Sequence, residues 1–248
     1  MLATTPELQS GMMRYPSQDG TTINAYISRP VAPGRYPGVI VTMEGMGLVE
    51  HTKDVARRFA AEGYLAIAPD LYTREGTPDV NDMQQVLKTL FSAPDTQAMA
   101  DLEGAAVYLK GQSHCNGKVG IIGFCSGGRY TLMMACKSKN LAAAVDSAGG
   151  HIIQDEHTPL RPVSPIDMVR SLSCPLLALF GEEDQNPSPA HAARLKTELD
   201  KYGKTYELKM YPNAGHAFFA DYRPSYRAAP AQDMWHRTLV FYGKYLKG

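Results

Sequence analysis

Apolar and polar positions follow two different patterns along this chain, and each pattern predicts one kind of secondary-structure element. Short apolar runs bounded by Gly, Pro or Asp are typical of strands that are covered on both faces. Such runs occupy residues 39–43, 64–69, 118–124, 141–145, 174–180 and 205–211. Between them, apolar residues recur at steps of three and four, as amphipathic helices require. Examples are Met99, Leu102, Ala106 and Leu109, then Ala192, Leu195, Leu199 and Tyr202, and a closing helix from Ala231 to Leu246.

The order of these elements predicts the architecture. Strands that alternate with helices are joined by right-handed crossovers, which gives a doubly wound, mostly parallel sheet with helices on both faces. Near the N-terminus, residues 12–16 and 23–28 flank the polar turn QDGTT and predict an antiparallel pair at one edge. No repeat or linker interrupts the pattern, so we expect one α/β domain over residues 1–248. The chemistry of such sheets lies at the carboxyl ends of the strands.

Composition narrows the classes of function. The chain has 25 Lys and Arg against 25 Asp and Glu, so it offers no excess of positive charge to nucleic acid or to an anionic membrane. No apolar run approaches the ~18 residues of a membrane span, and the first residues lack a signal pattern. The four cysteines are too dispersed for a disulfide framework: Cys115, Cys125, Cys136 and Cys174. We therefore expect a cytoplasmic protein with free thiols that binds neither nucleic acid nor membrane.

The strongest chemical signal directly follows the apolar run at 118–124. The sequence GFCSG (residues 123–127) matches the Gly-x-nucleophile-x-Gly turn between a strand and a helix, with Cys125 at its centre. This turn strains the central residue, and we expect the flanking glycines to avoid a collision with it. The turn also places the sulfur at a helix N-terminus, which favours a thiolate. Ser126 does not fit the centre, and a buried core cysteine is the alternative interpretation.

Two later strand ends supply the partners that a cysteine nucleophile needs. The sequence GEED (residues 181–184) follows one predicted strand, and PNAGH (residues 212–216) follows the next. We expect His216 to take the proton from Cys125, and Asp184 to orient the imidazole and stabilise its cation. Glu183 remains an alternative acid at this point.

Acyl transfer also needs two N–H donors that face the developing oxyanion. One is expected at the amide of Ser126, and the other at the amide of Gly45 in the loop EGMG (residues 44–47). Glu44 is either a solvated carboxylate or reaches Cys125 and keeps its thiol protonated until substrate arrives. Apolar residues that flank these loops predict the pocket walls: Met46, Tyr72 and Phe218.

These segments together resemble the dienelactone hydrolase family of α/β-hydrolases. The resemblance runs from about Gly11 to Tyr245. It rests on Glu44-Gly45, PDLY (69–72), NGKVGIIGFCSGG (116–128), FGEEDQNPSP (180–189) and NAGHAFF (213–219). It implies the α/β-hydrolase fold, a triad of Cys125, Asp184 and His216, and Glu44 as the glutamate that controls the thiol. It also implies hydrolysis of enol-lactones or related esters without a cofactor.

The sequence departs from the family in the two arginines that bind the substrate carboxylate. Ala220 stands at one matching position, and residues 77–92 offer only Lys88 at the other. Nearby arginines are Arg74, Arg223 and Arg227. We take Arg74 as the candidate substrate contact among them.

The leading hypothesis is a cofactor-independent cysteine hydrolase that cleaves small lactones or activated carboxylic esters through an acyl-enzyme on Cys125. The alternative is a redox-sensing or ligand-binding thiol protein on the same scaffold, without turnover. The predicted acid, base and oxyanion donors favour the enzyme, since a sensor needs only an exposed thiol of low pKa. We expect no metal, because the spacing of His151 and His157 matches no standard zinc site.

Overall fold

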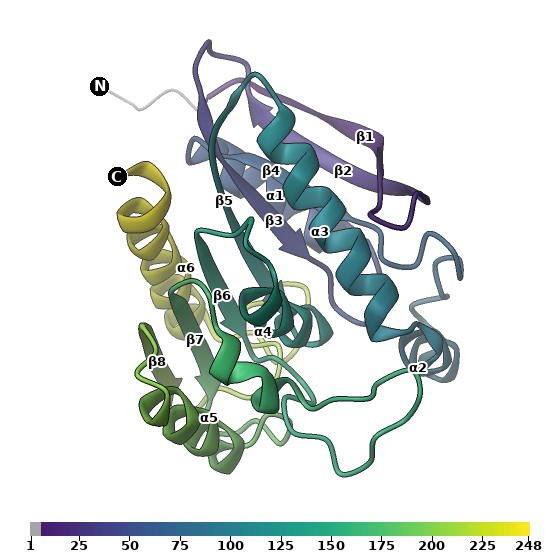
Figure 1. The fold of residues 1–248 in the computed structure, drawn as a ribbon, viewed down its shortest axis with the longest axis vertical. Helices are drawn as coiled ribbons and strands as arrows, with labels where there is room; N and C mark the ends of the chain where they lie inside the picture. The colour runs from purple at the N-terminus through teal and green to yellow at the C-terminus, as the bar shows by residue number, and fades with distance from the viewer. Residues whose placement is uncertain (1–5) are drawn as a thin grey trace.

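An eight-stranded sheet runs through the computed structural model, which describes residues 6–248 (Figure 1). The strands are β1 (Leu8–Pro16), β2 (Thr22–Pro30), β3 (Tyr36–Thr42), β4 (Leu65–Pro69), β5 (Cys115–Phe124), β6 (Ala143–Ser147), β7 (Leu176–Gly181) and β8 (Tyr206–Tyr211). Their order across the sheet is β1-β2-β4-β3-β5-β6-β7-β8. β2 pairs antiparallel with both β1 and β4, and the remaining neighbours pair in parallel. The predicted sheet with an antiparallel N-terminal edge is confirmed; residues 1–5 of the expected domain lie outside the described residues.

Helices cover both faces of this sheet. On one face lie α1 (Glu50–Ala61) and α6 (Ala228–Tyr242), which the π-helical turn η2 (Gly243–Lys247) continues. On the other face lie α3 (Asp95–Gly111), α4 (Ser126–Lys137), the 3-10 helix η1 (Pro165–Ser171) and α5 (Pro189–Lys201). Each face has its own apolar core, with Phe59 in the first and Leu132 in the second. Among the described residues, no helix has the length and hydropathy that a bilayer crossing needs.

The position of β6 corrects one predicted boundary. The apolar run at 141–145 predicts a strand there, whereas the strand spans Ala143–Ser147. Leu141 lies before the strand and is nevertheless buried in the core on the α4 face. Hydrophobicity alone therefore does not mark where this strand begins.

The strand order changes direction at β3, so a crevice is expected between the carboxyl ends of β3 and β5. From β3 the chain continues into β4 on one side, and β5 returns to pair with β3 on the other side. Such a reversal separates the loops that follow the two strands, and ligands of doubly wound sheets bind there. The loop after β3 begins at Met43 and the turn after β5 is centred on Cys125, so both border this crevice.

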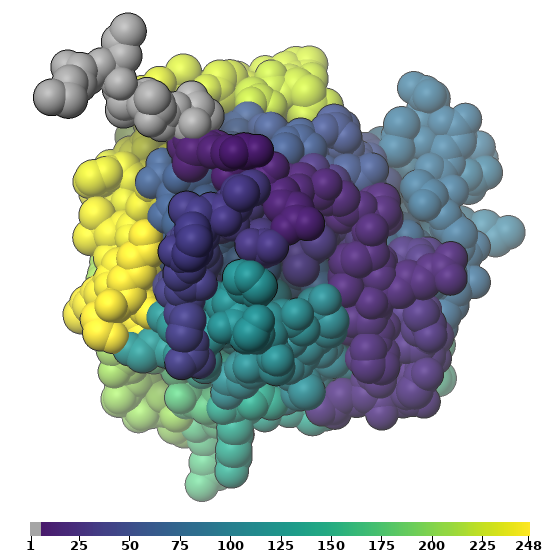
Figure 2. All heavy atoms as spheres, turned by 90° about the horizontal axis from the view of Figure 1, so that it is seen from above, coloured from purple at the N-terminus to yellow at the C-terminus, as the bar shows by residue number. Residues whose placement is uncertain are grey.

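Helix α2 (Met83–Ser92) packs differently from the other helices. Val86 is its only buried residue, whereas Met83, Leu87 and Phe91 are exposed. Its N-terminus is capped by the side chain of Asp82, which accepts hydrogen bonds from two backbone N–H groups. The helix and the segment before it project from one side of the molecule (Figures 1 and 2). Because only one of its residues is buried, α2 is a peripheral helix rather than part of the core.

The contact between α3 and the β1–β2 turn gives a test of the packing. A Cβ atom on Gly104 would lie 2.6 Å from the Pro16 carbonyl oxygen and 2.9 Å from Ser17 Cα. Because both atoms belong to the backbone, Gly104→Ala should lower the free energy of unfolding by about 1–3 kcal/mol. Gly111 on the same helix has open space around such a Cβ, so Gly111→Ala should change stability by less than about 1 kcal/mol. Urea unfolding measures both, and equal losses would contradict this packing.

Candidate active site

Cys125 lies in a strained turn between β5 and α4, at the carboxyl edge of the sheet. Its φ of 55° and ψ of −120° place it where non-glycine residues are rarely found. Backbone hydrogen bonds hold it on both sides: its N–H donates to the Ser147 carbonyl at 3.2 Å, and its carbonyl accepts from Gly150 N at 3.0 Å. The turn that the glycine pattern predicts is therefore present, and it places the sulfur at the N-terminus of α4.

Neighbouring backbone explains both glycines of the turn. A Cβ on Gly123 would overlap the carbonyl group of Gly127. A Cβ on Gly127 would lie 2.5 Å from the carbonyl oxygen of Thr42, at the end of β3. The nearest obstacles are thus neighbouring backbone atoms rather than Cys125, which corrects the expected reason. The turn, α4 and the end of β3 interlock.

Asp146, on β6, packs closely against Gly128 of α4 and Gly149. Its side chain is fully buried, and a Cβ on Gly149 would lie 2.5 Å from its Oδ1. Burial raises the pKa of Asp146 to about 7. Sequence reasoning missed this residue, although a lone Asp in the otherwise apolar run AAVDS is a signal that could have found it.

His216 and Asp184 meet beside Cys125, on the loops that follow β8 and β7. His216 Nδ1 lies 2.9 Å from Asp184 Oδ2. Asp184 is 1% exposed, and its other oxygen accepts a hydrogen bond from Asn186 N at 2.9 Å. Glu183 is exposed to solvent, so the geometry selects Asp184 as the carboxylate partner of the imidazole.

The imidazole of His216 favours its charged form. Burial lowers its pKa, but hydrogen bonds with Asp184 and Cys125 raise it, with a net pKa of about 10. A cationic ring beside a cysteine sulfur stabilises the thiolate.

The two predicted oxyanion donors have free backbone N–H groups. Among the described residues, the N–H groups of Gly45 and Ser126 make no backbone hydrogen bond, so both can donate to a ligand. The hydroxyl of Tyr72 donates to the Gly45 carbonyl at 3.0 Å. Tyr72, which was predicted as a pocket wall, is buried, and this hydrogen bond holds the loop in place.

Glu44 is buried beside this loop, at 3% exposure, and its carboxylate pairs with Arg223. Of the two expectations, the solvated carboxylate is wrong because the side chain is buried; no hydrogen bond joins the carboxylate to Cys125 among the described residues, and control of the thiol by Glu44 stays a prediction. A guanidinium is the stronger partner for a buried carboxylate than a thiol, because it brings a compensating charge. The positive charge of Arg223 is therefore compensated by Glu44.

A pocket of about 390 Å³ opens in front of Cys125 and His216. Leu87, Leu90 and Phe91 of α2 form one wall, and Gly150 and His151 of the loop after β6 form another. Its polar lining also includes two arginines, Arg129 and Arg161. This volume lies within the range of small-molecule sites, roughly 300–1,000 Å³.

Comparison with known proteins identifies the family. The model of the dienelactone hydrolase family matches residues 23–246. The chain belongs to the dienelactone hydrolase family. It is therefore a hydrolase of this family, with the α/β-hydrolase fold.

Individual relatives resemble the chain over nearly its whole length. A Methylorubrum extorquens protein named "Putative carboxymethylenebutenolidase" is 41% identical over 241 residues, which cover 96% of this chain and 82% of that protein. A Bradyrhizobium protein named "Probable 2-oxo-3-(5-oxofuran-2-ylidene)propanoate lactonase" is 32% identical, over 93% of this chain and 92% of that one. A structure named "Putative Dienelactone Hydrolase", from Klebsiella pneumoniae, is 38% identical with a TM-score of 0.89, over 96% of this chain and 100% of that one.

This member of the dienelactone hydrolase family carries two buried arginines in its pocket that sequence reasoning missed. Arg129 forms an ion pair with Asp95 at 2.6 Å and is neutralised by it. Arg161 is 7% exposed, donates to the Leu90 carbonyl at 2.6 Å and lies 4.6 Å from the centre of the Phe91 ring. It has no ion pair with a carboxylate in the part of the chain that the structure describes. Arg161 lies far along the chain from every motif, so the sequence gives no signal for it.

None of the four predicted substrate contacts, Tyr72 included, is among the residues that line the pocket at Cys125. Arg74 is paired with Asp101 and Asp19, both at 2.7 Å, so its charge is already satisfied outside the pocket. Phe218 is 1% exposed and packs in the core on the α6 face. Met46 lines a second pocket next to the one that holds Cys125. These predictions followed from sequence proximity to the catalytic loops, which does not determine where a side chain points.

The charge of His216 predicts a pH dependence of stability. Between pH 6.5 and about 10, the native protein keeps a proton on His216 that the unfolded chain has lost. The stability that this proton contributes is complete below pH 6.5 and declines as the pH rises to about 10. Asp184→Asn removes one interaction that raises the pKa, so the decline should become shallower. Urea unfolding across this pH range measures it, with the exposed Glu183→Gln as the matched control; equal slopes in both variants would contradict the assignment.

Proposed function

We propose that this chain hydrolyses lactones or activated carboxylic esters through a covalent acyl-enzyme on Cys125. One observation carries the proposal: the strained Cys125 lies beside an imidazole that is hydrogen-bonded to the buried Asp184. This is the nucleophile, base and acid arrangement of cysteine and serine hydrolases. The donors that the oxyanion needs are supplied by Gly45 and Ser126.

The first half of the reaction forms a thioester. The Cys125 thiolate attacks the carbonyl carbon, and the carbonyl oxygen, as it becomes negatively charged, accepts hydrogen bonds from the N–H groups of Gly45 and Ser126. When the tetrahedral intermediate collapses, the C–O bond breaks and the His216 imidazolium gives its proton to the departing alkoxide. In a lactone, that alcohol stays attached to the acyl group.

The second half releases the acid. His216, now neutral, takes a proton from water, and the hydroxide attacks the thioester carbonyl. Collapse of the second intermediate expels the Cys125 thiolate, and the product leaves as a carboxylic acid that ionises. Asp184 stabilises the imidazolium at both stages and keeps Nε2 directed at the reacting atoms.

A test separates this enzyme from a sensor that only forms a stoichiometric adduct. We expect repeated turnover of p-nitrophenyl acetate, with a transient mass increase of one acetyl group on the intact protein. Cys125→Ala should lower kcat by about a thousandfold or more, because the residual rate then comes from binding and the oxyanion donors alone. Cys174→Ala, which changes a buried cysteine outside the site, is the control. A single stable adduct without turnover would favour the sensor.

We further propose that the preferred substrate carries a carboxylate, which Arg161 binds. A buried guanidinium without a carboxylate partner is costly, and an anionic ligand in the pocket supplies the missing charge. The Bradyrhizobium relative is named for a propanoate lactone, which is a substrate of this kind. In this chain Arg161 would bind the substrate carboxylate in place of the family arginine at whose position Ala220 stands.

Matched substrates test Arg161. We expect Arg161→Met to lower kcat/KM for an enol-lactone carboxylate by about tenfold or more, because a charge-assisted hydrogen bond is lost. The carboxamide of the same lactone should lose less than about threefold. The control Arg194→Met changes an exposed arginine of α5. Equal losses on the acid and the amide would show that Arg161 serves the structure and not recognition of charge.

A further inference from the structure

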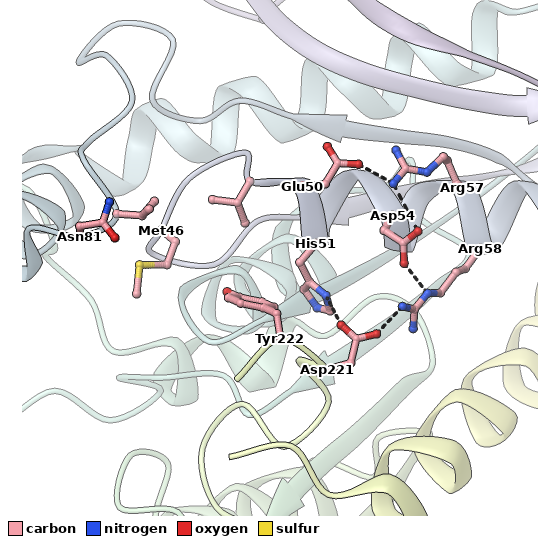
Figure 3. A pocket seen from close by; sticks show the side chains of 11 residues that line it. Met46, Glu50, His51, Asp54, Arg57, Arg58, Asn81, Asp221 and Tyr222 are labelled. Carbon is pink, nitrogen blue, oxygen red and sulfur yellow. Dashed lines mark hydrogen bonds and ion pairs between the residues drawn. The ribbon is translucent and has the colours of Figure 1, made fainter. Parts of the chain in front are cut away.

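A second pocket, of about 680 Å³, lies beside Met46 of the loop 44–47 (Figure 3). It is formed by the start of α1, the segment before α2 and the loop after β8, and it shares no lining residue with the pocket at Cys125. Met46, His51 and Tyr222 surround its centre. The triad and its oxyanion donors do not use this space.

His51 is a buried polar group in the wall of this pocket. Its side chain is 5% exposed, and among the described residues neither ring nitrogen makes a hydrogen bond. The nearest carboxylate, Asp221, is 3.5 Å from Nδ1. Burial lowers the pKa of His51, although the nearby carboxylates of Glu44, Asp221 and Asp54 oppose this and Arg58 supports it. The ring is therefore neutral at pH 7.5 and offers one donor and one acceptor.

The charged groups around His51 are already paired with one another. Arg58 binds both Asp54 and Asp221 at 2.6 Å, and Arg57 binds Glu50 at 2.6 Å (Figure 3). A charged ligand would find no unpaired group of opposite sign here. The remaining walls are Met46, Val49, Val80 and the ring of Tyr222, which are apolar, and Asn81, whose amide nitrogen donates to Asp79 at 3.1 Å.

We propose that this pocket binds a neutral, mainly apolar molecule with a hydroxyl group, namely an alcohol or a phenol. The hydroxyl would pair with His51, since a hydroxyl can both donate and accept. The apolar body would contact Met46 and Tyr222. The volume accommodates one small ligand of this kind. This ligand site is separate from the proposed hydrolysis and does not depend on it.

Four probes of one shape test the chemistry: 2-naphthalenemethanol, 2-methylnaphthalene, 2-naphthoate and 2-naphthylmethylammonium. The readout is the NMR signal of the His51 ring, assigned by its loss in His51→Phe, at pH 7.5. We expect the alcohol to shift this signal saturably. The methyl compound should bind about fivefold more weakly, because it lacks one hydrogen bond, and the two ions at least about tenfold more weakly. The His216 signal reports on the catalytic pocket in the same spectra.

A second variant keeps the test independent of changes at His51. Met46→Trp fills the pocket while leaving the imidazole in place, so the alcohol should no longer shift the His51 signal. His236, exposed on α6, is the internal control, and its signal should not move. The proposal fails if the alcohol moves His216 but not His51. It also fails if either ion shifts His51 at the same concentration as the alcohol, or if Met46→Trp leaves the titration unchanged.

Discussion

The positive φ of Cys125 is the constraint on which the rest of the site depends. A residue in this conformation costs about 1–3 kcal/mol and persists only where its surroundings impose it. Here the imposing groups are the hydrogen bonds to Ser147 and Gly150, and the close contact of the turn with Thr42. Because β3, β5 and β6 each supply part of this support, the sulfur stands in a fixed relation to the sheet. The loops after β7 and β8 then need only bring Asp184 and His216 next to this sulfur.

Electrostatics assigns different roles to three arginines near the site, of which Arg129 and Arg161 are buried and Arg223 is half-buried. Arg129 has its own carboxylate in Asp95, and Arg223 has Glu44, so each is part of a neutral pair that holds two elements together. Arg161 is held by a backbone carbonyl and an aromatic ring, neither of which carries a compensating charge. An uncompensated charge at the edge of a pocket attracts a ligand of opposite sign, whereas a compensated one stabilises the fold.

The features that could be predicted from sequence are those that chain order determines. The parallel sheet, its antiparallel edge and the strand ends that carry Cys125, Asp184 and His216 all follow from the spacing of apolar runs and glycines. Side-chain partners are set by three-dimensional packing instead. Phe218 follows the histidine loop but fills the core, and Arg74 finds Asp101, so neither lies in the catalytic pocket.

Arg161 is a residue that lines the pocket although the sequence did not predict it. Only the fold of the loop after β6 brings it next to α2. A sequence therefore reveals the chemistry of such a site better than it reveals the shape and charge of the pocket.

The uneven packing around the pocket bears on how such an enzyme can evolve. Gly123 and Gly127 of the turn at Cys125 are crowded by backbone atoms, so a substitution at either glycine meets an obstacle that one further change cannot remove. Helix α2, by contrast, buries only Val86 and directs several side chains toward the pocket at Cys125. Mutations can therefore accumulate on α2 at little structural cost. Enzymes that share the same reaction can therefore diverge in their substrates.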